Sequence, residues 1–515
     1  MGTLLPSASF FVFTKIGTFA FITAGLLIAI VVLVVLAEFA TMRRNTAVVA
    51  CVAGAILFIL GVLVASTAVI SKPQRFPRVG YDEPSRDVPG DLAGMTKAGR
   101  GGYLLPSGWF TTKGSQIVDE RGNPVRIASV GLPGNDGTDG ALRFLRSVNY
   151  QTTLRGAVAD GFNTIRIAWS DLTLNAFPKA GAIDYNLNPD LKGLSSMQVM
   201  DKVVQYAGAI GLRVIFDHHT NDGGEHGWGG QQTNGLWFDK GPGSDGTDGS
   251  GNRGTITAEK FQENTLALVR RYRNYPAVIG YDLDNEPLSH GAGGVSLNWR
   301  QGGPTDIWKM YSDLGNAILA ENPKLLIICE GPEGTANTGN GLAGIGPEGD
   351  LSAVGGIGGV PAKPVILKIP NQVVYSVHEY DTNVYDYGAN EQPSTLIKHM
   401  NDDWGYLYTR NIAPVWIGEM GSNLEKPQDR VWAQTLLDYM NGKNGAQGGP
   451  VFKSGEQPVG GSWWLWGHFP GEQTDGTLES DWATPRPDQQ GITDQLLFRL
   501  TQPEPGGGAG AGASQ

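Results

Sequence analysis

The sequence predicts an α/β protein in which a closed barrel of eight parallel strands, a (β/α)8 TIM barrel, follows two N-terminal transmembrane helices. Two long apolar runs stand near the start of the chain, and each is long enough to cross a bilayer. Further along, short apolar segments rich in β-branched residues alternate with helical stretches, as in parallel α/β folds. Hydrophobic residues make up 41% of the 515 residues, so the chain can bury a large core.

The apolar runs cover residues 16–36 and 47–70, and a short polar link at 41–46 separates them. A helix needs about 20 apolar residues to span a bilayer. The apolar core of a signal peptide is shorter, roughly 7 to 15 residues. Neither run carries the polar face of an ordinary core helix. We therefore predict that residues 1–70 form a two-helix, multi-pass anchor in the cell membrane.

The charges that flank the two runs bear on the orientation of this anchor. Arg43 and Arg44 favour a cytoplasmic link, because Lys and Arg accumulate in cytoplasmic loops, and this would place the rest of the chain outside. Lys72, Arg75 and Arg78 follow the second run and favour the opposite orientation by the same rule. Charge leaves both orientations open, and we expect an extracytoplasmic domain because of the substrate class derived below.

Composition divides the rest of the chain into three parts. Residues 71–102 are rich in Pro, Gly and charge, which is typical of a linker. Residues 503–515 form a Gly/Ala-rich tail that we expect to be disordered. Residues 103–502 form one catalytic domain, which carries a Gly/Asp-rich insertion at 229–254.

Charge and cysteine content exclude several classes of function. The formal net charge is −11 and no long basic run is present, so nucleic-acid binding would lack its usual electrostatic driving force. The two cysteines, Cys51 and Cys329, are too few for a cysteine zinc site or a disulfide scaffold, and Cys51 lies inside an apolar run. A neutral substrate fits this composition better.

Strand and helix candidates alternate along the catalytic domain, after a β-hairpin expected around residues 116–124. The strands are expected at residues 125–130, 164–169, 213–217, 278–283, 325–329, 373–377, 415–418 and 462–466. The helical candidates include residues 197–210, 258–272, 305–321, 395–408 and 428–440. Near-continuous apolar strands indicate a sheet buried on both faces. A doubly wound open sheet is the alternative, but no Gly-rich dinucleotide-binding turn follows the first strand.

Two glutamates stand at predicted strand ends, where a parallel barrel places its reactive groups. Glu286 follows the fourth strand and Glu419 ends the seventh. Hydrolysis of a glycosidic bond needs such a pair, one carboxyl to protonate the departing oxygen and one to support the positive charge on the sugar. If the two strands face each other, a separation of about 5–5.5 Å and a retaining mechanism are expected.

Further polar and aromatic residues fall on the same strand ends. They are Arg166, His219, Asn285, His378, Tyr380 and Trp464. Strand alternation puts His378 and Tyr380 on one face and turns Glu379 away. Asn285 could hydrogen-bond a sugar 2-hydroxyl, and Trp464 would offer a flat surface to a sugar ring. The neighbours His218 and His219 point to opposite faces and cannot easily share an ion, so no metal site is predicted.

The motifs that contain these residues resemble glycoside hydrolase family 5, and most closely its bacterial endo-β-1,4-glucanases. The similarity spans residues 101–488 and keeps the family's motif order. The matching segments are GFNTIR (161–166), FDHH (216–219), VIGYDLDNEP (278–287), VYSVHEY (374–380), IAPVWIGE (412–419) and WWLW (463–466). Residues 467–476 depart from the family, which usually carries Asn-Pro and Gly-Asp-Thr-Gly-Gly there.

The resemblance implies that Glu286 is the acid/base and Glu419 the nucleophile. It also implies that Arg166 and Tyr380 hold or tune Glu419. Arg166 is then expected to lower the pKa of Glu419 and keep it ionised while Glu286 carries a proton.

The remaining residues would contact the sugar. The resemblance assigns His219, Asn285 and His378 to the cleavage subsite and makes Trp464 its stacking floor. The family often has another residue before the third-strand histidine, and this favours His219 over His218.

These observations predict a membrane-anchored endo-β-1,4-glucanase that hydrolyses cellulose or a related β-glucan with retention and without a cofactor. A β-mannanase or other β-glycanase is the alternative, because the motifs determine the machinery and not the sugar. A non-catalytic carbohydrate-binding surface protein is less consistent, since one carboxylate would then be expected to be lost.

Overall fold

The computed structural model describes residues 100–221, 234–248, 252–288, 297–331, 364–381, 392–468 and 474–497. All of them lie in the second of the two units into which the chain divides, Val79–Gln515. The predicted membrane helices at 16–36 and 47–70, the linker and the C-terminal tail lie outside the described residues. Among the residues described, none of the helices is both long and apolar enough to span a bilayer.

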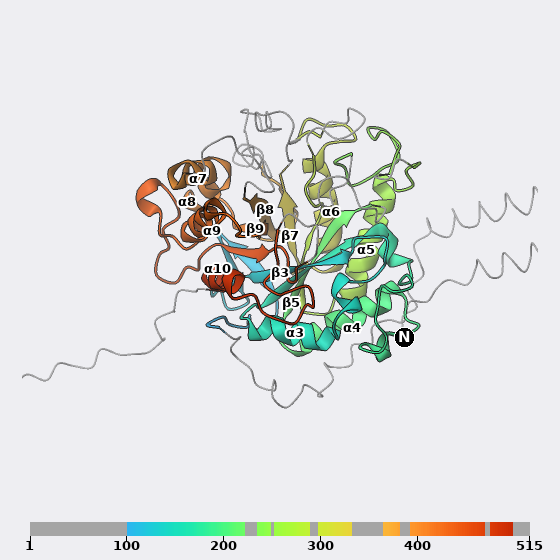
Figure 1. The fold of residues 1–515 in the computed structure, drawn as a ribbon. Helices are drawn as coiled ribbons and strands as arrows, with labels where there is room; N and C mark the ends of the chain where they lie inside the picture. The colour runs from blue at the N-terminus through green and yellow to red at the C-terminus, as the bar shows by residue number, and fades with distance from the viewer. Residues whose placement is uncertain are drawn as a thin grey trace, which may run out of the picture. The chain divides into compact units, whose positions relative to one another are not determined.

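Eight parallel strands form a closed barrel in the order β10-β3-β4-β5-β6-β7-β8-β9 (Figure 1). Their bounds are β3 Ala128–Asn135, β4 Thr164–Ser170, β5 Arg213–Thr220, β6 Val278–Asp282, β7 Leu326–Glu330, β8 Val373–Tyr380, β9 Val415–Gly421 and β10 Gly460–Trp463. Consecutive strands are neighbours, and β10 pairs with β3 to close the ring. The predicted barrel is therefore confirmed, and the open-sheet alternative is wrong.

Helices follow the strands and surround the barrel (Figure 1). They are α3 Tyr150–Ala159, α4 Ser196–Ala209, α5 Ala258–Tyr272, α6 Ile307–Glu321, α7 Pro393–Met400, α8 Tyr406–Thr409, α9 Pro427–Met440 and α10 Pro487–Leu497. Short single turns occur at Arg143–Arg146, Asp171–Leu174, Pro189–Leu191 and Gly445–Gln447. The side chains of Asn149, Ser195, Thr257 and Asp306 cap the first free amides of α3 to α6.

The sequence-based boundaries differ from the structure most clearly at the first strand and in one helix. The first strand begins at Ala128 and not at residue 125, because the backbone N–H of Val125 donates to Ile117 in the preceding hairpin. The predicted helix at 395–408 divides into α7 and α8 around the wider π-type turn Asn401–Gly405. A side chain at Gly405 would collide with Tyr439, so this turn lets the chain pack closely against α9.

The amino-terminal end of the barrel is filled with apolar side chains. The hairpin of β1 (Phe110–Lys113) and β2 (Gln116–Asp119) packs against it. The turn of the hairpin predicted around residues 116–124 follows directly, with an antiparallel bridge between Val118 and Pro124. The cluster contains Tyr103, Leu105, Phe110, Ile117, Val125, Ile127, Ile215, Ile279, Leu326, Ile328, Val374 and Trp416. Its members are all less than 9% exposed. The hairpin therefore closes one end of the barrel as part of the core.

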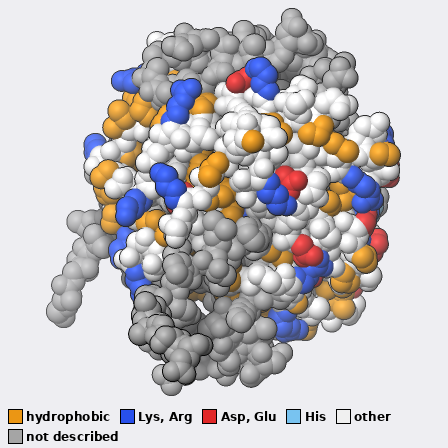
Figure 2. Space-filling model, turned by 90° about the vertical axis from the view of Figure 1, so that its left-hand side faces the viewer, with side chains coloured by type: hydrophobic (Ala, Val, Ile, Leu, Met, Phe, Trp, Pro, Cys, Tyr) orange, Lys and Arg blue, Asp and Glu red, His pale blue; other side chains and the backbone are white. Residues whose placement is uncertain are grey.

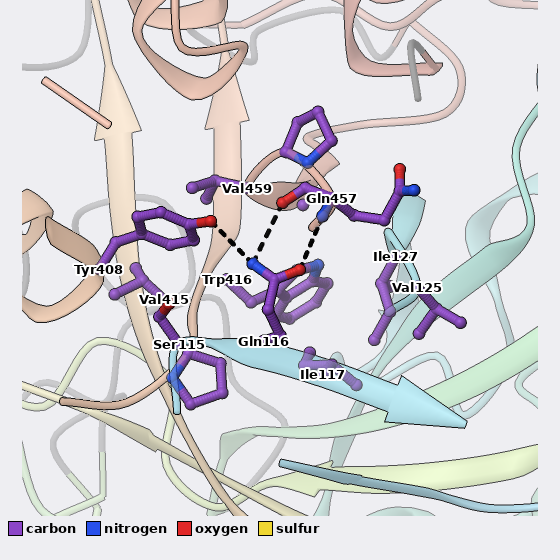
Figure 3. Close-up of a pocket in the computed structure, with 13 residues that line it drawn as sticks. Ser115, Gln116, Ile117, Val125, Ile127, Tyr408, Val415, Trp416, Gln457 and Val459 are labelled. Carbon is purple, nitrogen blue, oxygen red and sulfur yellow. Dashed lines mark hydrogen bonds between the residues drawn. The ribbon is translucent and has the colours of Figure 1, made fainter. Parts of the chain in front are cut away.

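A small polar site beside this end attaches the hairpin to the barrel wall (Figure 3). The Gln116 side-chain amide donates to the Tyr408 hydroxyl at 2.9 Å and to the Gln457 carbonyl at 3.2 Å. The Gln457 N–H donates back to the Gln116 Oε1 at 2.7 Å. Because each polar group of this buried amide has a partner, its burial is compensated.

The outer surface carries mixed side chains. Figure 2 shows the side that faces left in Figure 1, where basic, acidic and apolar side chains are interspersed. Val431 on α9 is 41% exposed, but single exposed apolar residues of this kind are normal on soluble domains. Cys329 is a buried free thiol on β7, and Cys51 lies outside the described residues.

Candidate active site

Two glutamates meet at the carboxyl end of the barrel. Glu286 follows β6 and Glu419 lies in β9, and both side chains are buried. The imidazole of His378, on β8, lies between them, with Nδ1 2.7 Å from Oε1 of Glu286 and 3.7 Å from Oε2 of Glu419. One oxygen of each carboxyl and a ring nitrogen of His378 all lie within 4.8 Å of one another. Two carboxyl groups at this spacing can act on one bond from opposite sides.

The backbone of Glu286 has an unusual conformation. Its φ angle is +47°, in the left-handed region that residues other than glycine rarely adopt. The neighbouring Asn285 donates its backbone N–H to the His218 carbonyl at 2.9 Å, which ties this turn to the end of β5. Backbone strain of this kind is often found at functional sites, where the surroundings hold it in place.

Glu419 accepts hydrogen bonds on both carboxylate oxygens. Arg166 on β4 donates to Oε1, and the Tyr380 hydroxyl on β8 donates to Oε2. Burial raises the pKa of Glu419, and the positive charges of His378 and Arg166 oppose this effect. Arg166 acts in the predicted direction, but the expectation that the pKa is lowered is wrong because the cost of desolvation is larger.

Arg166 is fully buried and organises a wider set of acidic groups. Its guanidinium lies 3.1 Å from Asp217, 3.0 Å from Asp282 and 3.3 Å from Glu330, and it donates to Asn285 Oδ1 at 2.9 Å. Burial disfavours its charge, but these carboxylates and that of the nucleophile candidate raise the pKa of Arg166 well above its usual value. A rigid, permanently charged fork therefore holds residues from several strands together.

The acidic groups around Arg166 differ in protonation. Burial and the nearby Glu330 raise the pKa of Asp282 well above its usual range, which favours the neutral form of this carboxyl. Burial acts in the same direction on Asp217, but Arg166 and His219 outweigh it and lower the pKa of Asp217. For Glu330, His378 and Arg166 together outweigh burial and lower its pKa. One arginine can thus sit among several acids without an excess of negative charge.

His219 and Trp464 form a flat wall of the site. Their ring centroids are 5.4 Å apart and the planes differ by 9°, so the rings are stacked. His219 Nδ1 lies 2.5 Å from Asp217, and this carboxylate outweighs burial and raises the pKa of His219 to about 9. A side chain at Gly131 on β3 would collide with the Trp464 indole, so this glycine makes room for the wall.

The neighbouring His218 points out of the barrel, as predicted from strand alternation. Its Nε2 lies 3.0 Å from Asp171 and its Nδ1 3.7 Å from Asp284. Phe261 on α5 packs against the ring, with centroids 4.6 Å apart. His218 therefore belongs to the packing between β5 and its surrounding helices, and only His219 reaches the site.

The structure brings all eight predicted site residues into one connected network. Asn285 joins His219, with 3.5 Å between Nδ2 and Nε2, and the contacts above connect the others. Glu286 and Trp464 are the most exposed of the eight, at 8% and 7%.

Sequence reasoning missed three members of this network, Asp217, Asp282 and Glu330. Asp217 and Asp282 directly follow the apolar runs at residues 214–216 and 278–281, a pattern that indicates a buried partner. Glu330 ends β7, one residue beyond the predicted end of that strand. No site residue was therefore predicted on the fifth strand, although a residue at its carboxyl end was to be expected at the site.

Among the residues that the structure describes, two groups of three side chains have the spacing of metal ligands. They are Asp217, His219 and Glu419, and Glu286, His378 and Glu419. Arg166 donates into the first group, and the pKa of His378 in the second is raised well above its usual value because two carboxylates, those of Glu330 and Glu419, outweigh burial. A guanidinium and an imidazolium already supply positive charge, so the donor set does not fit a cation well.

Comparison with known proteins agrees with this geometry. The sequence profile of the family described as cellulase (glycosyl hydrolase family 5) matches residues 118–449. An endoglucanase of Paenibacillus polymyxa is 32% identical over 344 residues, which cover 65% of this chain and 78% of the relative. The major extracellular endoglucanase of Xanthomonas campestris is 28% identical and covers 74% of this chain and 69% of its own length.

Solved structures show the same similarity. An endocellulase of the archaeon Pyrococcus horikoshii, crystallised with cellotetraose, superimposes with a TM-score of 0.61 and 26% identity. The match covers 76% of this chain and the whole of that one. The catalytic domain of the Xanthomonas campestris endoglucanase superimposes with a TM-score of 0.59 at 25% identity, over 76% of this chain and 99% of that chain.

The fold and the paired carboxyls define a glycoside hydrolase of the cellulase type, in which a parallel barrel carries the site at its carboxyl end. Within that class, the chain belongs to glycosyl hydrolase family 5, because the family profile matches more than half of it.

Proposed function

We propose that this protein is a retaining endo-β-1,4-glucanase that hydrolyses cellulose or a related β-glucan. The observation that carries the proposal is the separation of the two carboxyl groups, whose nearest grouped oxygens lie within 4.8 Å. Retaining enzymes keep their carboxyls about 5–5.5 Å apart, whereas inverting enzymes leave about 6.5–9.5 Å for a water molecule. The short spacing supports direct attack by one carboxylate.

The reaction then has two steps. In the first, Glu419 attacks the anomeric carbon, the glycosidic C–O bond breaks, and Glu286 gives its proton to the departing oxygen. In the second, a water attacks the same carbon and gives a proton to Glu286 while the bond to Glu419 breaks. Tyr380 and Arg166 hold the Glu419 carboxylate in position for both steps.

The charges of the buried network are consistent with the protonation states that the first step requires. The first step needs Glu286 protonated and Glu419 ionised. The raised pKa of Asp282 favours its neutral form. With Glu419 ionised as this step requires, three carboxylates face three cations, on Asp217, Glu330, Glu419, Arg166, His219 and His378. A balanced site can be buried at a lower cost than a net charge.

The proposed substrate class is supported by the stacked rings of His219 and Trp464 and by the ligand of a similar protein. The Trp464 indole offers an apolar face to a sugar ring, and His219 and Asn285 offer hydrogen bonds beside it. The similar endocellulase of Pyrococcus horikoshii was crystallised with cellotetraose, a β-1,4-linked glucan fragment. We extend this ligand class to the present chain.

Product analysis of the purified full-length chain in detergent tests the function. We expect faster hydrolysis of barley β-glucan and carboxymethyl-cellulose than of galactomannan or xylan, with internal cleavage reported by a rapid fall in viscosity. Proton NMR of a cello-oligosaccharide digest should show the β-anomer first. Initial release of the α-anomer would exclude retention, and preference for galactomannan would replace the glucanase by a mannanase.

We further propose that residues 1–70 anchor the enzyme in the cell membrane with the barrel on the outer side. The support is the length of the two apolar runs, 16–36 and 47–70, and a polymeric substrate that cells keep outside the cytoplasm. Protease added to intact cells should remove the catalytic domain, with a cytoplasmic protein as the intact control. Protection of the domain in intact cells, or its presence in the soluble fraction, would contradict this orientation or the anchor.

A further inference from the structure

A third glutamate, Glu330, lies behind the two carboxyls of the proposed reaction. It ends β7 and is 2% exposed. Its Oε2 accepts the backbone N–H of Glu286 at 2.8 Å. Its Oε1 lies 3.1 Å from Nε2 of His378 and 3.3 Å from Nη2 of Arg166.

These contacts connect Glu330 to Glu286 by two routes. One route is direct, through the backbone N–H, at the residue whose φ angle is +47°. The other passes through His378, whose Nδ1 lies 2.7 Å from Oε1 of the Glu286 carboxyl. The main chain of Glu286 is thus hydrogen-bonded to Glu330, and its side chain is hydrogen-bonded to His378, whose other ring nitrogen lies 3.1 Å from Glu330.

The route through His378 also determines which carboxyl oxygen of Glu286 carries the proton. An ionised Glu330 beside Nε2 favours the protonated imidazole, in which both ring nitrogens carry hydrogen. Nδ1 then donates to Oε1 of Glu286, and Oε1 can only accept. The proton that Glu286 must deliver is therefore left on Oε2, the oxygen that His378 does not occupy.

We propose that Glu330 is the positioning residue of the general acid: it holds Glu286 and, through His378, places the transferable proton on Oε2. This inference rests on the proposed glucanase function, and Glu330 itself does not touch the sugar. A purely structural role, as one more counter-ion of Arg166, is the alternative that the experiment has to separate.

Substrates with different leaving groups distinguish the positioning role of Glu330 from a purely structural role. Cellotetraose loses an alkoxide and needs a proton from Glu286, whereas 2,4-dinitrophenyl β-cellobioside loses a stable phenolate and needs none. kcat/KM reports the first step for both substrates. In Glu330→Gln, we expect kcat/KM on cellotetraose to fall by about 10- to 100-fold, part of the roughly 10²–10⁴-fold that general acids contribute, and on the dinitrophenyl substrate by less than about threefold.

Glu379→Gln is the matched control. Glu379 is a buried glutamate on the adjacent strand β8, but it faces the helices and accepts the Trp404 indole N–H at 2.6 Å. Its loss should lower the melting temperature and leave the ratio of the two kcat/KM values unchanged. Circular dichroism and melting of Glu330→Gln show that any kinetic change belongs to folded protein.

Each outcome of these kinetic measurements supports or contradicts the positioning role of Glu330. An equal fall on both substrates by folded Glu330→Gln, or no fall on either, would overturn the positioning role. Glu286→Gln should show the same selective loss as Glu330→Gln, and Glu419→Gln should lose both activities. If the wild-type chain hydrolyses no β-glucan, the proposed function fails, whereas an active wild type with an unselective Glu330→Gln removes this inference alone.

Discussion

The two ends of the barrel are built from the same strands, yet one is an apolar core and the other a charged site. On β7, Leu326 and Ile328 point into the barrel, and the next inward residue is Glu330. On β5, Ile215 is followed two residues later by Asp217. On each of these strands, one inward-facing residue is apolar and the next inward-facing residue is charged.

This division separates the energetic roles of the two ends. The apolar end removes hydrophobic surface from water and stabilises the fold. At the other end, desolvation of the charged groups costs free energy, which their partners outweigh for Arg166, His219 and His378 but not for Glu419. Stability and activity should therefore respond to substitutions at opposite ends, and four predictions test this.

The largest effect is expected at the charged end. Glu419→Gln removes the proposed nucleophile and should lower kcat by about 10³-fold or more, since the proposed covalent step depends on this group. The melting temperature should change little, because Arg166 keeps its contacts with Asp217 and Asp282. Hydrolysis of barley β-glucan and calorimetry measure the two quantities, and a variant that kept its activity would exclude this nucleophile.

The apolar end should show the reverse behaviour. Leu326→Ala opens a cavity among fully buried neighbours and should lower the free energy of unfolding by about 2–5 kcal/mol. kcat measured well below the melting temperature should stay within about twofold, because the cavity lies away from the reacting groups. Urea unfolding with parallel kinetics provides the test. A large loss of kcat in folded protein would mean that the two ends are coupled.

Tyr380→Phe sharpens the comparison within the charged end. It removes the hydroxyl that donates to the Glu419 carboxylate, and so it raises the pKa of Glu419 further. Since the ionised form attacks, the acid limb of the kcat/KM profile should move to higher pH, and kcat should fall by about 10- to 100-fold. The pH profile of cello-oligosaccharide hydrolysis tests this, and an unchanged acid limb would contradict it.

The smallest effect is expected in the pH dependence of stability, through His218, which points out of the barrel next to the charged end. Burial opposes the charge of His218, but Asp171 and Asp284 outweigh it and raise the pKa of His218 to about 9. A raised pKa in the folded state contributes stability that is complete below the unfolded value of about 6.5 and is lost as pH rises through about 9.

His218→Asn removes this contribution. Between these pH values the unfolding free energy of the variant should fall less steeply than that of the wild type, by at most about 1.4 kcal/mol per pH unit for one proton. His219, which also has a pKa near 9, remains and keeps part of the slope. Parallel slopes in urea titrations across this range would show that His218 is neutral in the folded protein.

The sequence alone was sufficient to predict the barrel and to name eight candidate residues that the structure brings together, because strand ends are local features. A short apolar run followed by Asn285-Glu286 or by His378 can be recognised without knowing its neighbours. The same reasoning missed Glu330, since a boundary that was wrong by one residue placed it outside the strand. It also gave the wrong direction for the pKa of Glu419, because burial in a crowd of charges is a property of the folded site.

The position of Glu419 marks this limit most clearly. Trp416 belongs to the apolar interior cluster, so strict alternation would turn Glu419, three residues later, away from the barrel axis. The pairing of β8 with β9 shifts register between Val377 and His378, and Glu419 instead reaches Arg166.

What the residues determine by themselves is the order of strands, the alternation of apolar and polar side chains, and the chemical groups available at each strand end. Which of those groups meet, and with what charge, was decided by closure of the barrel. The physical reason is that hydrophobic periodicity is encoded locally, whereas a register shift and the desolvation of a carboxylate depend on contacts between separate chain segments. Arg166 and Glu419, for example, are 253 residues apart in the chain.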